Sequence, residues 1–217
     1  MSLTVYGVPL SPFVRKLRLC LSEKGIDYQL EIVPPFNQPS WFLDINPLGR
    51  IPAIKDGNFS LADSSVICQY IEDKHPELTP LLGQSPEQKA TVRWLEKYAD
   101  YELSPLTTFT IFQHRVINPS MNKTCDENVV QLAMNEKLPA HFDYLERSLG
   151  NAEFLVGGTL SLADLSFTCQ IINMEYAGER LDEQRWPNLA ALISRIKARP
   201  SMQALLQDEQ AMLASLK

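Results

Sequence analysis

The stretch Leu3-Thr4-Val5-Tyr6-Gly7-Val8-Pro9-Leu10-Ser11-Pro12-Phe13-Val14 decides how this chain begins to fold. Its first four residues are mostly β-branched or aromatic and predict a short strand near 3–7. After it, apolar residues recur at helical spacing, at Val14, Leu17 and Leu21. This spacing predicts a helix near 12–24, which Gly25 ends. Because Ser and then Pro stand where the helix starts, Ser11 is the expected N-cap and Pro12 the first helical residue.

The hydroxyl of Ser11 is therefore expected at the end of a strand and at the positive end of a helix. Unpaired backbone N–H groups and the helix dipole both favour a negative charge at such a place. A thiolate is an anion of this kind, and the pKa of a thiol falls at a helix N-terminus. Two interpretations of Ser11 follow: a plain capping residue, or a hydroxyl that stabilises a bound thiolate.

The rest of the first eighty residues predicts a small mixed sheet. Strands are expected near 28–33, 52–55 and 59–61. Asp56-Gly57-Asn58 forms the turn between the last two strands, and a proline-rich loop separates the second strand from the third. A helix follows from about Ser64 to Lys74. The order β-α-β, loop, β-β-α predicts a domain of the α/β kind.

From residue 86 onward the pattern is helical throughout. Ser85-Pro86-Glu87-Gln88 is a capping box that starts a long helix, and Ser161-Leu162-Ala163-Asp164 resembles a second box with Asp in place of Glu or Gln. Ser161 and Asp164 are therefore expected to be structural capping residues. Further helices are expected at about 125–149, 188–198 and 201–215. We expect an α/β domain over 1–78, a linker over 79–85 and an all-helical domain over 86–217.

The composition excludes several classes of partner. The 217 residues carry a net charge of -6 without a Lys/Arg cluster, which argues against a nucleic-acid partner. No apolar stretch approaches the ~20 residues that span a bilayer, and no secretory signal is evident, so neither a membrane partner nor export is expected. The four cysteines form no C-x-x-C pair and the three histidines stand far apart. We therefore expect free thiols in a reducing cytoplasm and no bound metal.

Two further stretches carry chemical information: Asn46-Pro47-Leu48-Gly49-Arg50-Ile51-Pro52-Ala53-Ile54 and Leu61-Ala62-Asp63-Ser64-Ser65. The Ile51-Pro52 bond is a candidate cis peptide, although general frequencies favour a trans proline at a strand edge. Exposed backbone groups of Ile51 could pair with another backbone like an added strand. Asp63 and Ser64 stand at a helix start and could hold an α-amino-α-carboxylate group. A plain N-cap is the alternative for this pair.

In order and at suitable intervals, these stretches resemble the cytosolic glutathione transferase family over nearly the full length of the chain. The matching pieces are the strand to Ser11-Pro12-Phe13, Asn46-Pro47-x-Gly49-Arg50-Ile51-Pro52, Asp63-Ser64-x-x-Ile67, and Phe154-Leu155-Val156-Gly157 leading to Ser161-x-x-Asp164. The resemblance, to a bacterial-type and serine-dependent member, implies a thioredoxin-like N-terminal domain that binds glutathione. It also implies that the all-helical C-terminal domain supplies the pocket for a second, electrophilic substrate.

The resemblance implies a role for each matching position. Ser11 would donate a hydrogen bond to the glutathione thiolate, with Tyr6 of the preceding strand as a rival donor. Ile51, before Pro52, would pair with the cysteinyl part, and Asp63 and Ser64 would hold the γ-glutamyl end. Three more residues are implied near the glycyl carboxylate or the thiol, namely Arg50, Gln38 and Phe13. Candidates for the second-substrate pocket, most of which also suit a helical core, are Tyr98, Tyr101, Glu102, Phe109, Phe112 and Arg115.

The implied chemistry is attack by the thiolate on a small hydrophobic electrophile, with organic hydroperoxides as a further substrate class. Glutathione is then a cosubstrate, no cofactor is bound covalently, and the resemblance implies a homodimer that acts in detoxification in the cytoplasm. Ser11 in place of Cys argues against the thiol-transferring branch, and Val8-Pro9-Leu10-Ser11 lacks the Ser-Ser-Cys stretch usual in the maleylacetoacetate isomerase branch. The alternatives are a glutathione-dependent isomerase and a non-catalytic binding or regulatory protein on the same scaffold.

Overall fold

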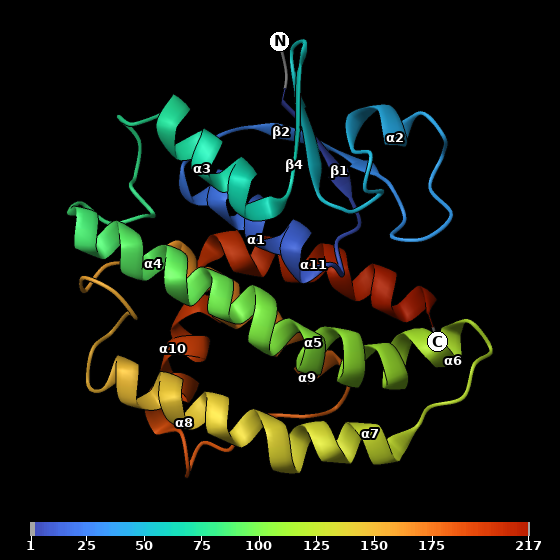
Figure 1. Cartoon of the computed structure of the whole chain (residues 1–217), viewed down its shortest axis with the longest axis vertical. Coiled ribbons are helices and arrows are strands. Elements are labelled where there is room, and N and C mark those ends of the chain that lie inside the picture. The colour runs from blue at the N-terminus through green and yellow to red at the C-terminus, as the bar shows by residue number, and fades with distance from the viewer. Residues whose placement is uncertain (1–2, 217) are drawn as a thin grey trace.

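The computed structural model describes residues 3–216, and a four-stranded mixed sheet forms its N-terminal part (Figure 1). The strands are β1 (Leu3–Gly7), β2 (Tyr28–Ile32), β3 (Ala53–Asp56) and β4 (Phe59–Ala62), in the spatial order β2-β1-β3-β4. Strand β1 is parallel to β2 and antiparallel to β3, and β3 is antiparallel to β4. This is the small mixed sheet that the order of elements predicts.

Helices cover both faces of the sheet because successive strand residues point to opposite sides. Val5 and Ile54 are cross-strand partners and belong to the main core, with helices α1 (Pro12–Glu23) and α3 (Ser64–Lys74). Their neighbours Tyr6 and Ala53 are also partners and form a second, smaller core with Val33 and Phe42. Phe42 begins helix α2 (Phe42–Ile45), where the sequence predicts only a loop. Four residues are too few to show a helical period.

The C-terminal part is entirely helical. A continuous helical run from Pro86 to Ser120 consists of α4 (Pro86–Tyr98), α5 (Ser104–Leu106) and α6 (Asn118–Ser120), joined by the π-helical segments η1 (Ala99–Leu103) and η2 (Thr107–Ile117). A second run joins α7 (Glu127–Leu132), the π-helical η3 (Ala133–Lys137) and α8 (Leu138–Leu149). The last helices are α9 (Leu162–Tyr176), α10 (Pro187–Lys197) and α11 (Pro200–Ser215). The bounds of the α7–α8 run, α10 and α11 agree with the predicted helices to within two residues, and α4 and α9 begin directly after the predicted capping residues Ser85 and Ser161.

Helix α9 lies at the centre of the molecule. Every residue from 162 to 174 is buried, because α9 packs against α1, α4, η2 and α10 at once. A helix surrounded in this way has no solvent-facing side, so most of its residues are apolar or small, and its polar residues Asp164, Gln170 and Asn173 are buried as well. Figure 1 shows α11 lying beside α1, so two elements of the C-terminal part hold the first helix of the N-terminal part. One hydrophobic core therefore runs through both parts.

The segment between α3 and α4 is anchored to both parts of the molecule. Lys24 Nζ donates to the carbonyl oxygen of Thr79 at 2.8 Å, and the N–H of Leu81 donates to Glu72 Oε1 at 3.1 Å. From the other side, the N–H of Leu162 donates to the carbonyl oxygen of Leu81 at 2.8 Å. Leu81 is buried in the common core. This connection therefore holds a fixed path between the two parts.

Within residues 3–216, no helix has the length and apolarity that a membrane span requires. In the same residues, His, Cys, Asp and Glu side chains form no cluster of three or more that could hold a metal ion.

Candidate functional site

Ser11 lies where β1 gives way to α1 and caps that helix. Its Oγ accepts a hydrogen bond from the N–H of Val14 at 3.4 Å, and its own N–H donates to the carbonyl oxygen of Val8 at 3.1 Å. The strand end approaches the helix closely at Gly7, where a Cβ would come within 2.5 Å of Val14 Cγ2. Glycine is therefore required at this position. The half-buried hydroxyl of Ser11 sits at the positive end of α1, as the sequence predicts.

Tyr6, the rival donor, lies on the opposite face of the sheet from α1. Its ring packs against Trp41 and Phe42, with centroids 5.7 and 6.2 Å apart. Burial, and then the charge of Glu31, raise the pKa of the Tyr6 phenol. This position gives Tyr6 a clear packing role in the smaller core.

The loop before β3 is held by side chains that bind its backbone. Asn46 Nδ2 donates to the carbonyl oxygen of Arg50 at 2.6 Å, and Asn46 Oδ1 accepts from the N–H of Leu48 at 3.1 Å. Gln38 Nε2 donates to the carbonyl oxygen of Gly49. Gln38 thus shapes the loop, while the Arg50 side chain is exposed.

Ile51 brings this loop next to the end of β1. The Ile51-Pro52 peptide bond is cis. Ile51 Cβ lies 3.5 Å from the point where a Cβ on Gly7 would stand, so the loop adjoins the strand that leads to Ser11. Among residues 3–216, no backbone group pairs with the N–H or the carbonyl oxygen of Ile51. Both groups are available to an extended ligand backbone.

Asp63 caps α3 in a conformation that is unusual for a residue with a side chain. Its φ is 73° and its ψ is 119°, and such backbone conformations cost about 1–3 kcal/mol and persist only where the surrounding structure holds them. Its Oδ1 accepts from the N–H groups of Ser65 at 3.0 Å and Val66 at 3.2 Å. The side chain is 58% exposed, and Lys97 Nζ lies 3.9 Å away. Ser64 follows directly and is buried. Asp63 therefore offers a carboxylate at a strained helix start.

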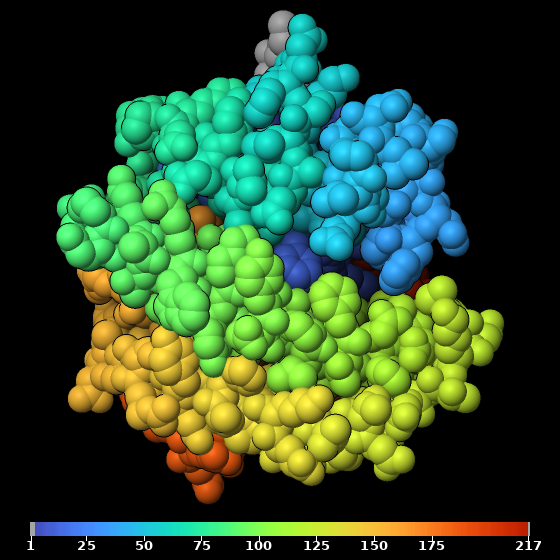
Figure 2. Space-filling model, in the orientation of Figure 1, coloured from blue at the N-terminus to red at the C-terminus, as the bar shows by residue number. Residues whose placement is uncertain are grey.

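A hollow separates the sheet domain from the long helical run. Figure 2 shows dark blue atoms from the start of the chain at its centre, between the cyan β4–α3 region and the green helical run. Phe13 of α1 and Phe109 of η2 stack across the two parts, with ring centroids 6.2 Å apart. Phe109 is 59% exposed and Tyr101 is 64% exposed. The rings of Phe13 and Phe109 give the neighbourhood of Ser11 an apolar and partly open wall, while Tyr101 is exposed on η1.

The other pocket candidates have partners elsewhere in the helical part. The Tyr98 hydroxyl is 2.7 Å from His141 Nδ1, so Tyr98 lies against α8. Phe112 is 4% exposed and belongs to the core. Arg115 forms ion pairs with Glu127 and Glu179, and these carboxylates raise its pKa. Glu102 is exposed.

Asp164 is completely buried at the start of α9. Its Oδ1 accepts from the N–H of Leu155 at 2.8 Å, and its Oδ2 accepts from the N–H and the hydroxyl of Ser161 at 2.8 and 2.7 Å. Burial raises the pKa of Asp164 to about 6, although the three donors act in the opposite direction. This arrangement ties the loop before α9 to the helix and agrees with the predicted capping role.

Sequence reasoning missed the buried charges on α1. Lys16 Nζ lies 2.9 Å from Glu96 Oε1 and 2.7 Å from Asp100 Oδ2, and it also contacts Ser65 Oγ at 3.1 Å. Arg15 is equally buried. A helix that is apolar on one side would normally place its cations in solvent. The one feature of the sequence that could have indicated their burial is their place in the first turns of the helix that Ser11 caps, between the two parts of the chain.

Comparisons with known proteins agree with this geometry. Residues 5–80 match the family model "Glutathione S-transferase, N-terminal domain", and residues 112–209 match "Glutathione S-transferase, C-terminal domain". Glutathione S-transferase 4 of Zea mays is 35% identical over 213 residues, which cover 94% of this chain and 91% of the relative. Glutathione S-transferase F13 of Arabidopsis thaliana is 30% identical over 93% of each chain.

Solved structures show the same likeness. A glutathione S-transferase from Rhodospirillum rubrum F11 superposes with a TM-score of 0.86 at 27% identity, covering 94% of this chain and 91% of that one. Glutathione transferase F7 from Populus trichocarpa gives a TM-score of 0.83 at 25% identity, over 95% and 98% of the two chains. With a thioredoxin-like N-terminal domain followed by a helical domain, this chain belongs to the glutathione S-transferase family of enzymes.

Proposed function

We propose that this chain activates glutathione through Ser11 and transfers it to a hydrophobic electrophile. The family uses glutathione as a substrate. The observation that carries the proposal is the Ser11 hydroxyl at the N-terminus of α1, beside a loop whose Ile51 backbone is unpaired. In this arrangement, the hydroxyl donates to the sulfur while Ile51 pairs with the cysteinyl backbone of glutathione.

The ends of glutathione are assigned to residues around this centre. Asp63 receives the γ-glutamyl ammonium, and the hydroxyl and N–H of Ser64 at the start of α3 receive the γ-glutamyl carboxylate. The exposed position of the Asp63 carboxylate supports this role. Arg50 binds the glycyl carboxylate, and Gln38 holds the loop that carries Arg50. Pro52 completes the loop.

The free energies of one hydrogen bond and the helix dipole are large enough to activate the thiol without a base. A free thiol has a pKa of about 8.5, and lowering it by ~2 requires roughly 2.7 kcal/mol in favour of the anion. A hydroxyl hydrogen bond to a charged group contributes about 1.5–3 kcal/mol, and the helix dipole adds ~0.3–1 kcal/mol.

The thiolate then attacks an electrophilic carbon: a C–S bond forms, and the bond to the leaving group, the halide of an aryl halide, breaks and releases the halide ion. We assign the binding of the apolar part of the substrate to the rings of Phe13, Tyr101 and Phe109. An organic hydroperoxide is a second acceptor for the same thiolate: the sulfur attacks the outer oxygen, the O–O bond breaks and an alcohol leaves. The resulting sulfenic acid condenses with a second glutathione to give the disulfide and water.

The test is Ser11→Ala, with Tyr6→Phe as the comparison. We expect Ser11→Ala to lower the rate of conjugation to an aryl halide tenfold or more, while the affinity for glutathione changes little. Titration of bound glutathione by thiolate absorbance should show a raised thiol pKa in Ser11→Ala and no change in Tyr6→Phe. An unchanged thiol pKa in Ser11→Ala, together with a raised one in Tyr6→Phe, would transfer the role to Tyr6.

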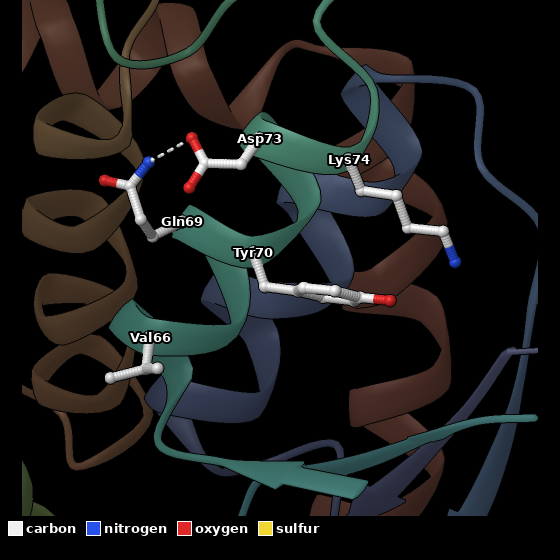
Figure 3. A pocket seen from close by; sticks show the side chains of 5 residues that line it. All are labelled: Val66, Gln69, Tyr70, Asp73 and Lys74. Carbon is white, nitrogen blue, oxygen red and sulfur yellow. Dashed lines mark hydrogen bonds between the residues drawn. The ribbon is translucent and has the colours of Figure 1, made fainter. Parts of the chain in front are cut away.

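We also propose that the chain forms a homodimer through the outer face of α3. Figure 3 shows a shallow depression there, lined by Val66, Gln69, Tyr70, Asp73 and Lys74. Phe59 packs on Tyr70 with ring centroids 5.1 Å apart, yet it is 46% exposed. A second copy of the chain would cover the exposed Phe59–Tyr70 pair. It would also lie close to Asp63 and Ser64 at the start of α3.

The proposed function is divided between two domains and a linker. We propose that residues 1–78 bind glutathione, that 79–85 link the two domains, and that 86–217 supply the electrophile pocket. The hydrogen bonds of Leu81 to both parts of the molecule support this role for the linker, because they keep the two sides of the hollow at a fixed separation.

A further inference from the structure

A fully buried ion pair links the last helix of the chain to the first. Arg15 of α1 donates from Nε to Glu209 Oε1 and from Nη2 to Glu209 Oε2, both at 2.7 Å. Both residues have no exposed surface. Glu209 Oε2 also accepts from the Tyr176 hydroxyl at 2.7 Å. A charge pair in such a place is stable only when its remaining hydrogen-bonding groups are satisfied, and here they are.

The same guanidinium fixes the side-chain amide of Asn173. Arg15 Nη1 donates to the carbonyl oxygen of Cys169 at 2.8 Å and to Asn173 Oδ1 at 3.0 Å. An arginine has only donors, so the amide oxygen of Asn173 must face it and the amide nitrogen must face away. Asn173 is itself completely buried, so no solvent competes for either group.

The amide nitrogen of Asn173 reaches the residue before Ser11. Nδ2 donates to the carbonyl oxygen of Leu10 at 3.3 Å. This carbonyl belongs to the peptide bond that supplies the N–H of Ser11, and that N–H donates to the carbonyl oxygen of Val8 at 3.1 Å. The peptide plane before Ser11 is therefore held at both ends. Its orientation decides where the Ser11 side chain can point, because a peptide unit is rigid.

We propose that Glu209, Arg15 and Asn173 are positioning residues for the Ser11 hydroxyl, acting from α11 through α1 and α9 on the carbonyl oxygen of Leu10. The proposal rests on the function proposed for Ser11. It assigns to the C-terminal helix, through Glu209, a part in the orientation of the thiolate donor. A displacement of about 1 Å at such a donor weakens its hydrogen bond to the thiolate, because hydrogen bonds depend steeply on distance and angle.

The main test is Asn173→Ala, which removes the contact to Leu10 and leaves Arg15 its bonds to Glu209 and Cys169. We expect the pKa of bound glutathione to rise by about one, from about 6.5, and kcat to fall about threefold at pH 7 and about eightfold at pH 6, as the thiolate fraction falls. The KM for glutathione should stay within about threefold, because the groups that hold the peptide are untouched. Should Asn173→Ala fail to fold, Asn173→Ser and Glu209→Gln are measured in its place, with the same direction expected.

Glu23→Gln is the matched control. Glu23, the last residue of α1, accepts two hydrogen bonds of 2.7 and 2.6 Å from Arg199, the N-cap residue of α11. This contact joins the same two helices at the end of α1 that is far from Ser11. Glu23→Gln should lower the melting temperature and leave the thiol pKa unchanged. If Glu23→Gln raises the thiol pKa as much as Asn173→Ala does, the effect is a general result of loosened domains and the proposal is wrong.

A double-mutant cycle separates this proposal from the role of Ser11 itself. In the Ser11→Ala background, Asn173→Ala should cause no further rise of the thiol pKa, because the group it positions is gone. If Ser11→Ala raises the thiol pKa and folded Asn173→Ala does not, only the positioning role is refuted. If Ser11→Ala has no effect either, the function proposed for Ser11 is refuted, and the positioning role with it.

Discussion

The ring of Phe13 on α1 stacks on the ring of Phe109 in η2, with centroids 6.2 Å apart and planes 27° apart. An aromatic pair of this kind contributes about 0.5–1.5 kcal/mol. Because Phe109 is largely exposed, one of its faces is free for a flat substrate. The pair thus connects Phe13, two residues after Ser11, with η2 on the other side of the hollow.

Phe109→Ala should weaken binding of the electrophile and leave glutathione unaffected. We expect the KM for an aryl halide to rise about three- to tenfold, which corresponds to the loss of one aromatic contact. The free energy of unfolding should fall by about 0.5–1.5 kcal/mol, because the stacking on Phe13 is lost as well. Steady-state kinetics with each substrate varied in turn measures the two KM values, and urea unfolding measures the change in stability. Leu132→Ala, exposed on α7, is the control, and an equal effect there would contradict the assignment.

Asp63→Asn isolates the charge of Asp63 from its backbone role. Asn caps helices as well as Asp does and tolerates a positive φ, so stability should change little. The KM for glutathione should rise roughly tenfold, since a charge-assisted contact to the ammonium is lost. Turnover at saturating glutathione should stay within about twofold. A collapse of turnover with unchanged glutathione binding would show that Asp63 acts in the chemical step.

Asp164 should make stability depend on pH. Its pKa is about 6 in the fold, against about 3.9 in an unfolded chain, so the folded protein binds the proton more tightly. The free energy of unfolding should therefore fall as pH rises from about 4 to about 6, by up to ~3 kcal/mol, and stay level above that. Urea unfolding across this range, compared with Asp164→Ala, isolates the contribution of this residue.

Asp164→Ala should remove that contribution and leave three donors without an acceptor. We expect a lower melting temperature, slower refolding and near-normal specific activity of the folded fraction. A variant with native stability but no activity would show that Asp164 takes part in the chemistry.

The dimer proposal predicts a sedimentation mass of about twice the 24.6 kDa of one chain at micromolar concentration. Phe59→Glu should shift the protein towards the monomer, because a charge would be buried at the apolar edge of the interface. Leu132→Glu places the same charge on a surface outside α3 and should leave the dimer intact. A wild-type protein that sediments as a monomer would refute the proposal.

The sequence predicts the local structure around Ser11 because short-range chemistry determines it. Alternation puts Val5 and Tyr6 on opposite faces of β1, and the Ser-Pro pair determines where α1 begins. The helices of the C-terminal part follow in the same way from capping boxes and apolar periodicity. Helix α2 is the exception, since its fold depends on Phe42 filling the space under the sheet.

The tertiary environment of these residues could not be predicted. Nothing local in the sequence indicates that Arg15 meets Glu209, 194 positions later, or that Asn173 meets Leu10. The positive φ of Asp63 likewise depends on how β4 meets α3. Site residues can thus be recognised by their neighbours in the chain, whereas the residues that position them are recognised only in three dimensions.

The cations of α1 limit how this enzyme can diversify. Arg15, Lys16 and Arg18 belong to one domain, but their carboxylate partners Glu209, Asp100 and Asp208 belong to the other. If the C-terminal half were exchanged at the linker, the buried cations of α1 would lose their carboxylate partners unless the new half supplied matching acids. Each buried pair that is broken would lower the stability of the fold by about 3–5 kcal/mol. The two halves are separate domains by fold, but their paired charges must be kept or changed together. New substrate preferences are therefore expected to arise by substitution at exposed rim positions, where no counter-charge must change at the same time.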